Sequence, residues 1–265
     1  MPRILYALLL TPVLALAAGD SLSRLPAGLQ VKEGGPRTYR FVCDYSHLTT
    51  KGDLVSTKRF SADYTRGLPG GKVRWDQVTV ANMKVPGGEF LAPQKREFMD
   101  GFTYRLADTK NMLQAEFFPG FPPSAYEERN LVWDAHMLES FGQEFFEKLS
   151  LNVPHHMGAG TAPLAGTGQF ENKDVELTWV GISRRNGQEC AVIRYDSYFN
   201  KLAMKGPGLD MVGRSHYWGD IWVSLTTKQI EYATLYEDVL SELKLAGQPN
   251  IMIVNVFRRG TFAPK

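Results

Sequence analysis

Residues 176–199 read ELTWVGISRRNGQECAVIRYDSYF, and this stretch decides the fold. Two runs in which apolar and polar side chains alternate lie on either side of Asn186-Gly187. Alternation with a period of two is typical of a strand that buries one face, and Asn-Gly is the dipeptide that two-residue hairpin turns favour. Since so tight a turn joins antiparallel neighbours, the stretch predicts antiparallel strands at about 169–182 and 188–199.

Similar runs extend the pattern towards both ends of the chain. Short turns separate most of them, as at Gly52, at Gly70-Gly71 and at 226–228. The further strands are expected at about 38–47, 55–65, 72–82, 102–106, 214–225, 229–239 and 250–259. These runs predict a mainly antiparallel sheet, curved or rolled into an open half-barrel.

One segment departs from the strand pattern. Apolar residues between Leu131 and Leu138 recur at helical spacing, which predicts an amphipathic helix at about 125–150. Ser124 followed by Glu127 is a capping-box pattern, so we expect Ser124 to begin the helix. The apolar stripe needs a large hydrophobic partner, and the sheet is the only candidate. The expected fold class is therefore mainly β (α+β), with one main helix covering the sheet.

The N-terminus is typical of an export signal. Arg3 supplies a positive start, Ile4–Leu16 is a short apolar run, and Ala15 and Ala17 are the small residues of a cleavage site. The run is shorter than the roughly 20 apolar residues of a membrane anchor, and no other stretch is long enough to span a bilayer. We expect residues 1–17 to be removed and the mature chain to be secreted or periplasmic.

The rest of the chain is expected to form one domain. No period of 20–50 residues repeats, so the sequence predicts a flexible segment at 18–37 and a single β-rich domain at 38–265. The formal net charge is +2, or +1 once Arg3 is removed (29 basic against 28 acidic residues). A near-neutral surface argues against nucleic acid as a partner.

Two cysteines remain in the mature chain, Cys43 and Cys190, and both fall in predicted strands. In an oxidising compartment they can form a disulfide, which requires neighbouring strands with Cα atoms within about 7 Å. The alternative is two separate buried thiols that pack as small hydrophobes.

Signatures of catalysis are missing. The glycine pairs at 158–160 and 166–168 lack a third glycine and a following helix, so we expect no nucleotide cofactor. The histidines are spread over the sequence, so they could form a metal site only if the fold brought several of them together. They are His47, His136, His155, His156 and His216. Carboxylates on successive strands, Asp44, Asp63 and Asp76, are more often solvated charges than an acid–base pair. We therefore name no catalytic or metal residue.

Residues 216–225, HYWGDIWVSL, divide clearly between two faces. One face has the apolar residues that a core beneath the helix requires: Tyr217, Ile221, Val223 and Leu225. The other carries Trp218, Asp220 and Trp222, a mixture of apolar bulk and directed hydrogen bonds that suits a ligand site. A second layer of core is the alternative interpretation.

The layout of residues 38–82 resembles the opening of the periplasmic lipoprotein-carrier superfamily. Strand, glycine turn at Gly52, strand, glycine turn at Gly70-Gly71 and a strand with Arg74-Trp75 follow in that order. The resemblance is one of architecture, and it implies an open half-barrel with a helical lid that holds acyl chains. The helix of this chain lies in the middle of the sequence, which departs from that pattern, and no functional residue carries over.

The leading hypothesis is a binding protein for a hydrophobic or amphipathic, lipid-like small molecule or acyl chain, held between the sheet and the helix. The expected anchors are Trp218, Trp222 and Trp133, with a mobile rim of Phe117, Phe118 and Phe121. The alternatives are a secreted hydrolase or metal-dependent enzyme that uses loop histidines, and an envelope assembly protein with exposed aromatic residues.

The export signal makes a direct prediction. N-terminal sequencing of protein recovered from the secreted or periplasmic fraction should begin at Ala18, because the cleavage site places small residues at 15 and 17. Material that begins at Met1 would contradict the assignment.

Overall fold

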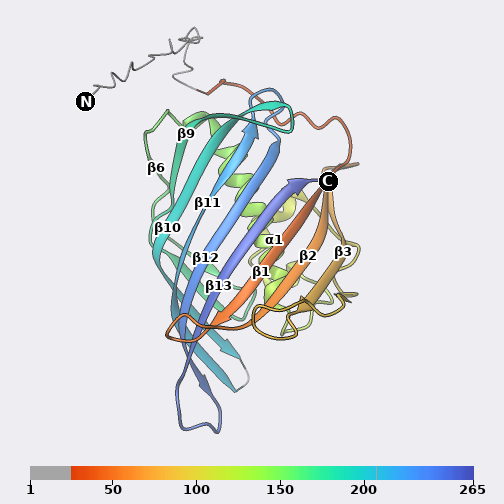
Figure 1. Cartoon of the computed structure of the whole chain (residues 1–265). Coiled ribbons are helices and arrows are strands. Elements are labelled where there is room, and N and C mark those ends of the chain that lie inside the picture. The colour runs from red at the N-terminus through yellow and green to blue at the C-terminus, as the bar shows by residue number, and fades with distance from the viewer. Residues whose placement is uncertain (1–24, 207) are drawn as a thin grey trace, which may run out of the picture.

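The computed structural model describes residues 25–206 and 208–265. The export signal expected at 1–17 and the first part of the segment at 18–37 lie outside these residues. Within them, thirteen strands form one antiparallel sheet, as the sequence predicted (Figure 1). The strands are β1 (Arg37–Leu48), β2 (Leu54–Leu68), β3 (Lys72–Asn82), β4 (Gln94–Lys95), β5 (Phe102–Arg105), β6 (His155–His156), β7 (Gly160–Pro163), β8 (Gly168–Asn172), β9 (Glu176–Arg185), β10 (Gln188–Gly206), β11 (Leu209–Ser224), β12 (Ile230–Leu245) and β13 (Met252–Pro264).

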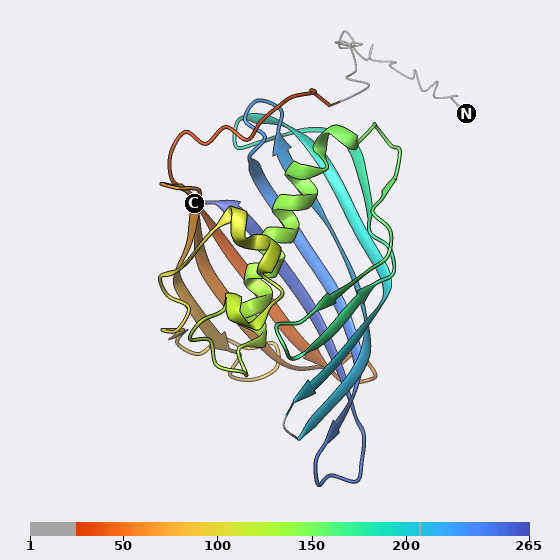
Figure 2. The ribbon, with the colours of Figure 1, turned by 180° about the vertical axis from the view of Figure 1, so that it is seen from behind.

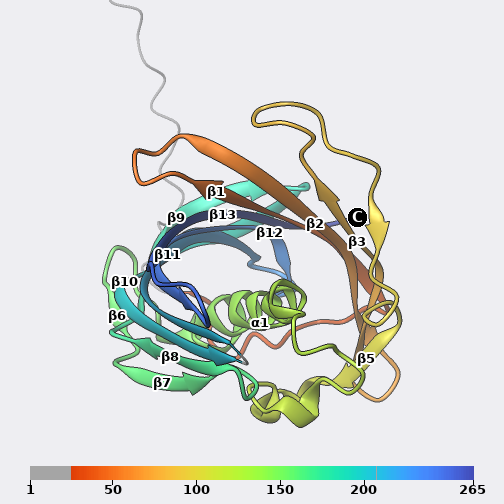
Figure 3. The ribbon, with the colours of Figure 1, turned by 90° about the horizontal axis from the view of Figure 1, so that it is seen from below.

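The strand order brings distant parts of the chain together. β1 pairs with β13 in the middle of the sheet, β2 and β3 follow on one side, and β12, β11 and β10 follow on the other. β3 also pairs with β4 and β5, and β10 also pairs with β8 and β9. The two outer ends of the sheet do not pair with each other in the described part of the chain, so the sheet is an open half-barrel (Figure 3).

The main helix, α1 (Tyr126–Glu139), lies inside the half-barrel against its concave face (Figure 2). A π-helical turn at Ser140–Glu144 continues it, so the helical segment ends a little before the predicted residue 150. Shorter 3₁₀ helices lie at Leu106–Asn111, Ala115–Phe117 and Phe146–Lys148. Among the helices in the described ranges, none is long and apolar enough to cross a membrane.

The predicted capping box is wrong. Ala125, not Ser124, is the N-cap residue, and no side chain caps the first turn. Glu127 instead reaches Lys58 of β2, with its Oε1 3.1 Å from Nζ. Glu127 therefore forms an ion pair with the sheet instead of capping the first turn of the helix.

Alternate residues of the central strands face α1 and form the core. On β11, Ile221 and Val223 are fully buried, as the division of faces predicted. Gly142 of the π-helical turn lies so close to them that an added Cβ would stand 3.1 Å from a methyl group of each. This contact places the helical backbone directly on the concave face.

The Asn186-Gly187 turn is confirmed. β9 and β10 meet there as antiparallel neighbours, and both turn residues have positive φ, 50° for Asn186 and 76° for Gly187. Positive φ at both positions is the signature of the turn type whose twist matches that of the flanking strands.

The prediction that Cys43 and Cys190 lie on neighbouring strands is wrong. Cys43 is on β1 and Cys190 is on β10, with β13, β12 and β11 between them. Adjacent strands lie about 4.8 Å apart, and a disulfide requires Cα atoms within about 7 Å, so four strand spacings are too many to bridge. Both residues are buried free thiols.

The turn provides a test of the fold. We expect Gly187→Val to lower the melting temperature, because a β-branched residue at positive φ costs about 1–2 kcal/mol. Gly34→Val is the matched control, since Gly34 does not have positive φ and has open space where the Cβ would stand. Equal melting temperatures for the two variants would contradict the turn assignment.

Candidate binding surfaces

The aromatic residues expected at the helix side pack into the interior. Phe118 and Phe121 are 3% and 8% exposed, and Phe118 contacts the Trp133 ring with centroids 5.9 Å apart. Trp133 donates a hydrogen bond from Nε1 to the Met112 carbonyl at 2.8 Å. Phe117 is partly buried against the same cluster. These four side chains close the gap between α1 and the β5 side of the sheet rather than forming an open rim.

The tryptophan face of β11 points the other way. Because Ile221 faces α1, residues an odd number of positions from it project from the outer, convex face. Trp218, Asp220 and Trp222 are therefore on the opposite side of the sheet from Trp133. They lie on one face, as predicted, but no single cavity between sheet and helix can include both groups.

Buried ion pairs hold α1 in the half-barrel. Arg258 of β13 bonds both to Asp134 of α1 and to Glu237 of β12, and Ser215 donates a hydrogen bond to Glu237 at 2.5 Å. All four side chains are buried. Removing one partner of a buried pair typically costs about 3–5 kcal/mol, because it leaves a charge without compensation.

A second buried pair holds the other end of the helix. Arg66 of β2 lies 2.6 Å from the Glu139 carboxylate and 2.6 Å from that of Glu33, and Tyr64 donates to Glu139 at 3.1 Å. Gln143 accepts from Arg66 at 3.2 Å. The sequence pattern did not reveal either pair, because each arginine stands on an inward-facing strand position where an apolar residue is expected.

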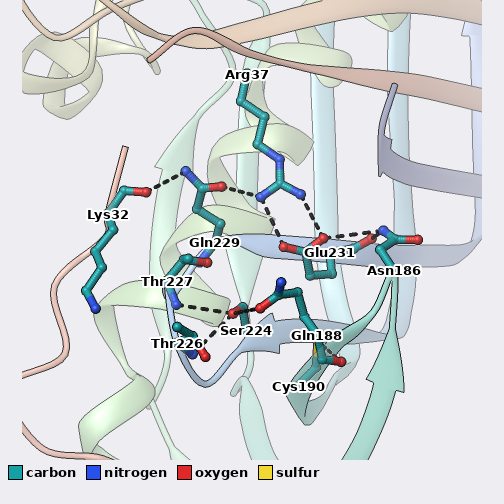
Figure 4. A network of polar contacts seen from close by, with 10 residues as sticks. All are labelled: Lys32, Arg37, Asn186, Gln188, Cys190, Ser224, Thr226, Thr227, Gln229 and Glu231. Carbon is teal, nitrogen blue, oxygen red and sulfur yellow. Dashed lines mark hydrogen bonds and ion pairs between the residues drawn. The ribbon is translucent and has the colours of Figure 1, made fainter. Parts of the chain in front are cut away.

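A cluster of polar side chains lies at one end of the half-barrel (Figure 4). Arg37 donates two hydrogen bonds to Glu231, at 3.0 and 2.7 Å, and also contacts Gln229. Asn186 donates to the Glu231 carbonyl at 3.0 Å, and Gln229 donates to the Lys32 carbonyl at 2.8 Å. These contacts attach the N-terminal segment and the β9–β10 turn to the end of the sheet.

The pocket beside this cluster, of about 480 Å³, is polar. Its charged groups already have partners: Glu231, with a side chain only 4% exposed, bonds Arg37, and Lys265 lies 2.7 Å from Asp63. A ligand would have to displace these pairs, so we assign the cluster a structural role.

Nucleophiles and metal ligands are not assembled in the described residues. Burial raises the pKa of Cys190 to about 11 and that of Cys43 to about 12, so both remain thiols at neutral pH. Nδ1 of the exposed His156 lies 2.7 Å from Asp174, but no three metal-ligating side chains gather within the described ranges. The three carboxylates noted in the sequence each pair with an arginine: Asp44 with Arg59, Asp63 with Arg40 and Asp76 with Arg74.

Beyond the start of α1, the inner face of the sheet continues, and no helix of residues 25–206 and 208–265 lies over it (Figure 2). The hairpins β10–β11 and β12–β13 project past the rest of the molecule (Figures 1 and 2). Their paired positions place Met204, Met211, Leu243 and Met252 in one row across four strands. The same inner face carries further partly exposed apolar residues: Leu202, Leu209, Val239, Leu245, Val254 and Val256.

Helix and strand geometry explains the uncovered face. The helical segment 126–144 spans about 28 Å, whereas the sixteen residues of β11 span about 53 Å. The helix therefore covers only about half of the length of the central strands. The apolar alternation continues to the end of the hairpins all the same.

The end of the β12–β13 hairpin is apolar on both faces. Ile251, Met252 and Ile253 are consecutive and are 58%, 49% and 47% exposed. Exposing three neighbouring apolar side chains to water is unfavourable. Such runs are therefore typical of surfaces that contact an apolar partner. This end of the sheet is therefore the strongest candidate for contact with an apolar ligand.

The buried Asp134 makes a pH-dependent prediction. Burial raises its pKa to about 6, against an ordinary value near 3.8. Because the folded-state pKa is the higher one, the contribution of Asp134 to stability is complete below about pH 4 and is lost as the pH rises through about 6. The melting temperature of the wild type relative to that of Asp134→Asn should therefore fall between pH 4 and 7. Asp238→Asn, at an exposed carboxylate, is the control and should show a smaller change over this range.

No protein-family model and no curated protein sequence matches this chain.

Proposed function

We propose that this chain is an exported binding protein for a lipid-like ligand, whose acyl chain lies on the inner face of the projecting hairpins. The observation that carries the proposal is the row of Met204, Met211, Leu243 and Met252, which continues the core pattern where none of the described helices covers it.

Burial of apolar surface supplies the driving force. Each methylene group that leaves water contributes about 0.8 kcal/mol, so a long acyl chain gains several kcal/mol by lying along these side chains. Methionine is frequent in the row, and its unbranched, polarisable side chain adapts to ligands of different shape. The proposed site thus suits a class of acyl chains rather than one rigid molecule.

The position of α1 modifies the site expected from the sequence. The ion pairs of Asp134 and Glu139 fix the helix against the sheet, so the ligand is proposed to lie beyond the helix and not beneath it. The Tyr126 hydroxyl lies 3.9 Å from the point where a Cβ on Gly206 would stand, at the boundary between the helix and the uncovered face. A hydroxyl at this boundary can hydrogen-bond a polar head group.

Titration with a fluorescent fatty-acid probe tests the proposal. Met211→Gln and Leu243→Gln should weaken binding by about tenfold each, since each removes apolar contact worth on the order of 1–2 kcal/mol. Val212→Gln is the matched control, because it places the same side chain on the outer face of the β10–β11 hairpin. This variant should bind nearly as well as the wild type.

Two outcomes would contradict the proposal. Wild-type protein that binds no fatty-acid probe, and retains no lipid in native mass spectrometry after purification from its own compartment, would exclude a lipid-like ligand. Equal losses in the inner-face and outer-face variants would show that the ligand lies elsewhere.

A further inference from the structure

The convex face of the sheet carries a second arrangement that the proposed lipid site does not use. Figure 1 looks onto this face, and in the described part of the chain no other helix or strand lies in front of β11, β12 and β13 there. Strand pairing aligns its residues in rows that cross the strands. Trp222 stands opposite Tyr232, and Trp218 stands opposite Tyr236. The two aromatic pairs are four residues apart on β11, which is about 13 Å.

Three aromatic rings form a platform across three strands. Trp218 and Tyr236 have centroids 5.9 Å apart and planes 21° apart, and Tyr236 and Phe257 have centroids 6.4 Å apart and planes 29° apart. All three side chains are partly exposed. The three rings form a row of partly exposed aromatic side chains with similar plane angles, which we call the aromatic platform.

A cation lies over the second aromatic pair on this face, Trp222 and Tyr232. The Arg185 guanidinium lies 3.9 Å from the centre of the Tyr232 ring and 5.9 Å from that of Trp222. A cation over a ring face occupies the surface on which a ligand would stack. Trp222 therefore has a cation beside its ring, while it shares the strand, the face and the residue type of Trp218.

Hydrogen-bonding side chains separate the two aromatic pairs. Arg194 and Asp220 form an ion pair at 3.0 Å, and Thr234 accepts a hydrogen bond from the Asp220 backbone at 3.1 Å. On the far side of the platform, Asp44 binds Arg59 through two bonds of 2.7 Å. The apolar rings thus lie between rows of donors and acceptors.

The charges on this face nearly balance. Four carboxylates surround the platform against three guanidinium groups: Asp44, Asp196, Asp220 and Asp238 against Arg59, Arg194 and Arg259. A face with this balance attracts neither polyanions nor polycations strongly, and it offers no basic surface for the phosphates of a nucleic acid. An acyl chain laid across the rings would remove water from these charged groups without replacing their hydrogen bonds, which is costly.

We propose that the aromatic platform of Trp218, Tyr236 and Phe257 is a binding site for a neutral oligosaccharide or polysaccharide. The C–H face of a sugar ring packs on the aromatic rings, while its hydroxyl groups donate to Asp220 and accept from Arg194. A sugar is the ligand class that satisfies both the apolar rings and the adjoining ionic side chains. The site is independent of the lipid-like ligand, because it lies on the opposite face of the sheet.

A glycan panel tests this assignment on the full mature chain. The probes are cellohexaose, chitohexaose, xylohexaose and maltohexaose. Their binding is measured by tryptophan fluorescence and by titration calorimetry. The wild type should bind at least one of them, and Trp218→Ala should weaken that binding about tenfold, the scale of one lost aromatic contact. Trp222→Ala should change it by less than threefold, since Arg185 lies beside that ring and would have to move before a sugar could pack there.

Two further variants separate binding from stability. Trp218→Phe keeps an aromatic ring and should retain most of the affinity, and Asp220→Asn should weaken binding while leaving the platform intact. Cross-strand aromatic pairs also stabilise sheets, so a melting temperature is measured for each variant.

Three results would overturn the proposal: no binding of the wild type to any glycan in the panel, equal losses in Trp218→Ala and Trp222→Ala, or a loss in Trp218→Ala that a fall in its melting temperature fully explains. A concentration-dependent dimer that Trp218→Ala dissolves, without glycan binding, would assign the platform to a second copy of the chain instead.

Discussion

The rest of the structure depends on the burial of one helix in the concave side of the sheet. The inner face of the central strands is mainly apolar, and it needs a partner that removes it from water. α1 provides that partner for about half of the length of the strands, because a helix rises about 1.5 Å per residue and a strand about 3.3 Å. The covered half is the core, and the uncovered half is the face proposed to bind an acyl chain.

The buried ion pairs give this packing its register. An amphipathic helix against a broad apolar face has several positions of similar energy, and hydrophobic contact alone distinguishes poorly between them. Arg258 with Asp134 and Arg66 with Glu139 are satisfied in only one of these positions. Since a buried charge without a partner is costly, the pairs penalise every displaced arrangement more than they stabilise the native one.

Both proposed binding surfaces follow from the alternation of a single sheet. Successive residues of β11 point to opposite faces, so the strand contributes Met211 to the uncovered inner face and Trp218 to the outer platform. The inner face is aliphatic and suits a flexible chain, whereas the outer face combines aromatic rings with ionic side chains. The two ligand classes are thus separated by the thickness of the sheet, and binding of one leaves the other face free.

Local patterns in the sequence determined the elements of this fold. Alternating runs, the Asn186-Gly187 turn and the helical stripe define the main strands and the helix, because each depends on residues close together in the chain. The same alternation places Trp218, Asp220 and Trp222 on one face. Which face looks towards the helix, and how far the helix reaches, depended on contacts between residues far apart in sequence.

Only the tertiary structure decided the strand order and the buried charges. Strand order separates Cys43 from Cys190 by three strands, although both are well placed within strands, because local alternation carries no information on which strands become neighbours. Packing brings Trp133 and Phe118 into the core and leaves Trp218 on the outer face. Arg258 stands at a position that local pattern assigns to an apolar residue, since its partners come from a helix and a strand distant in the chain.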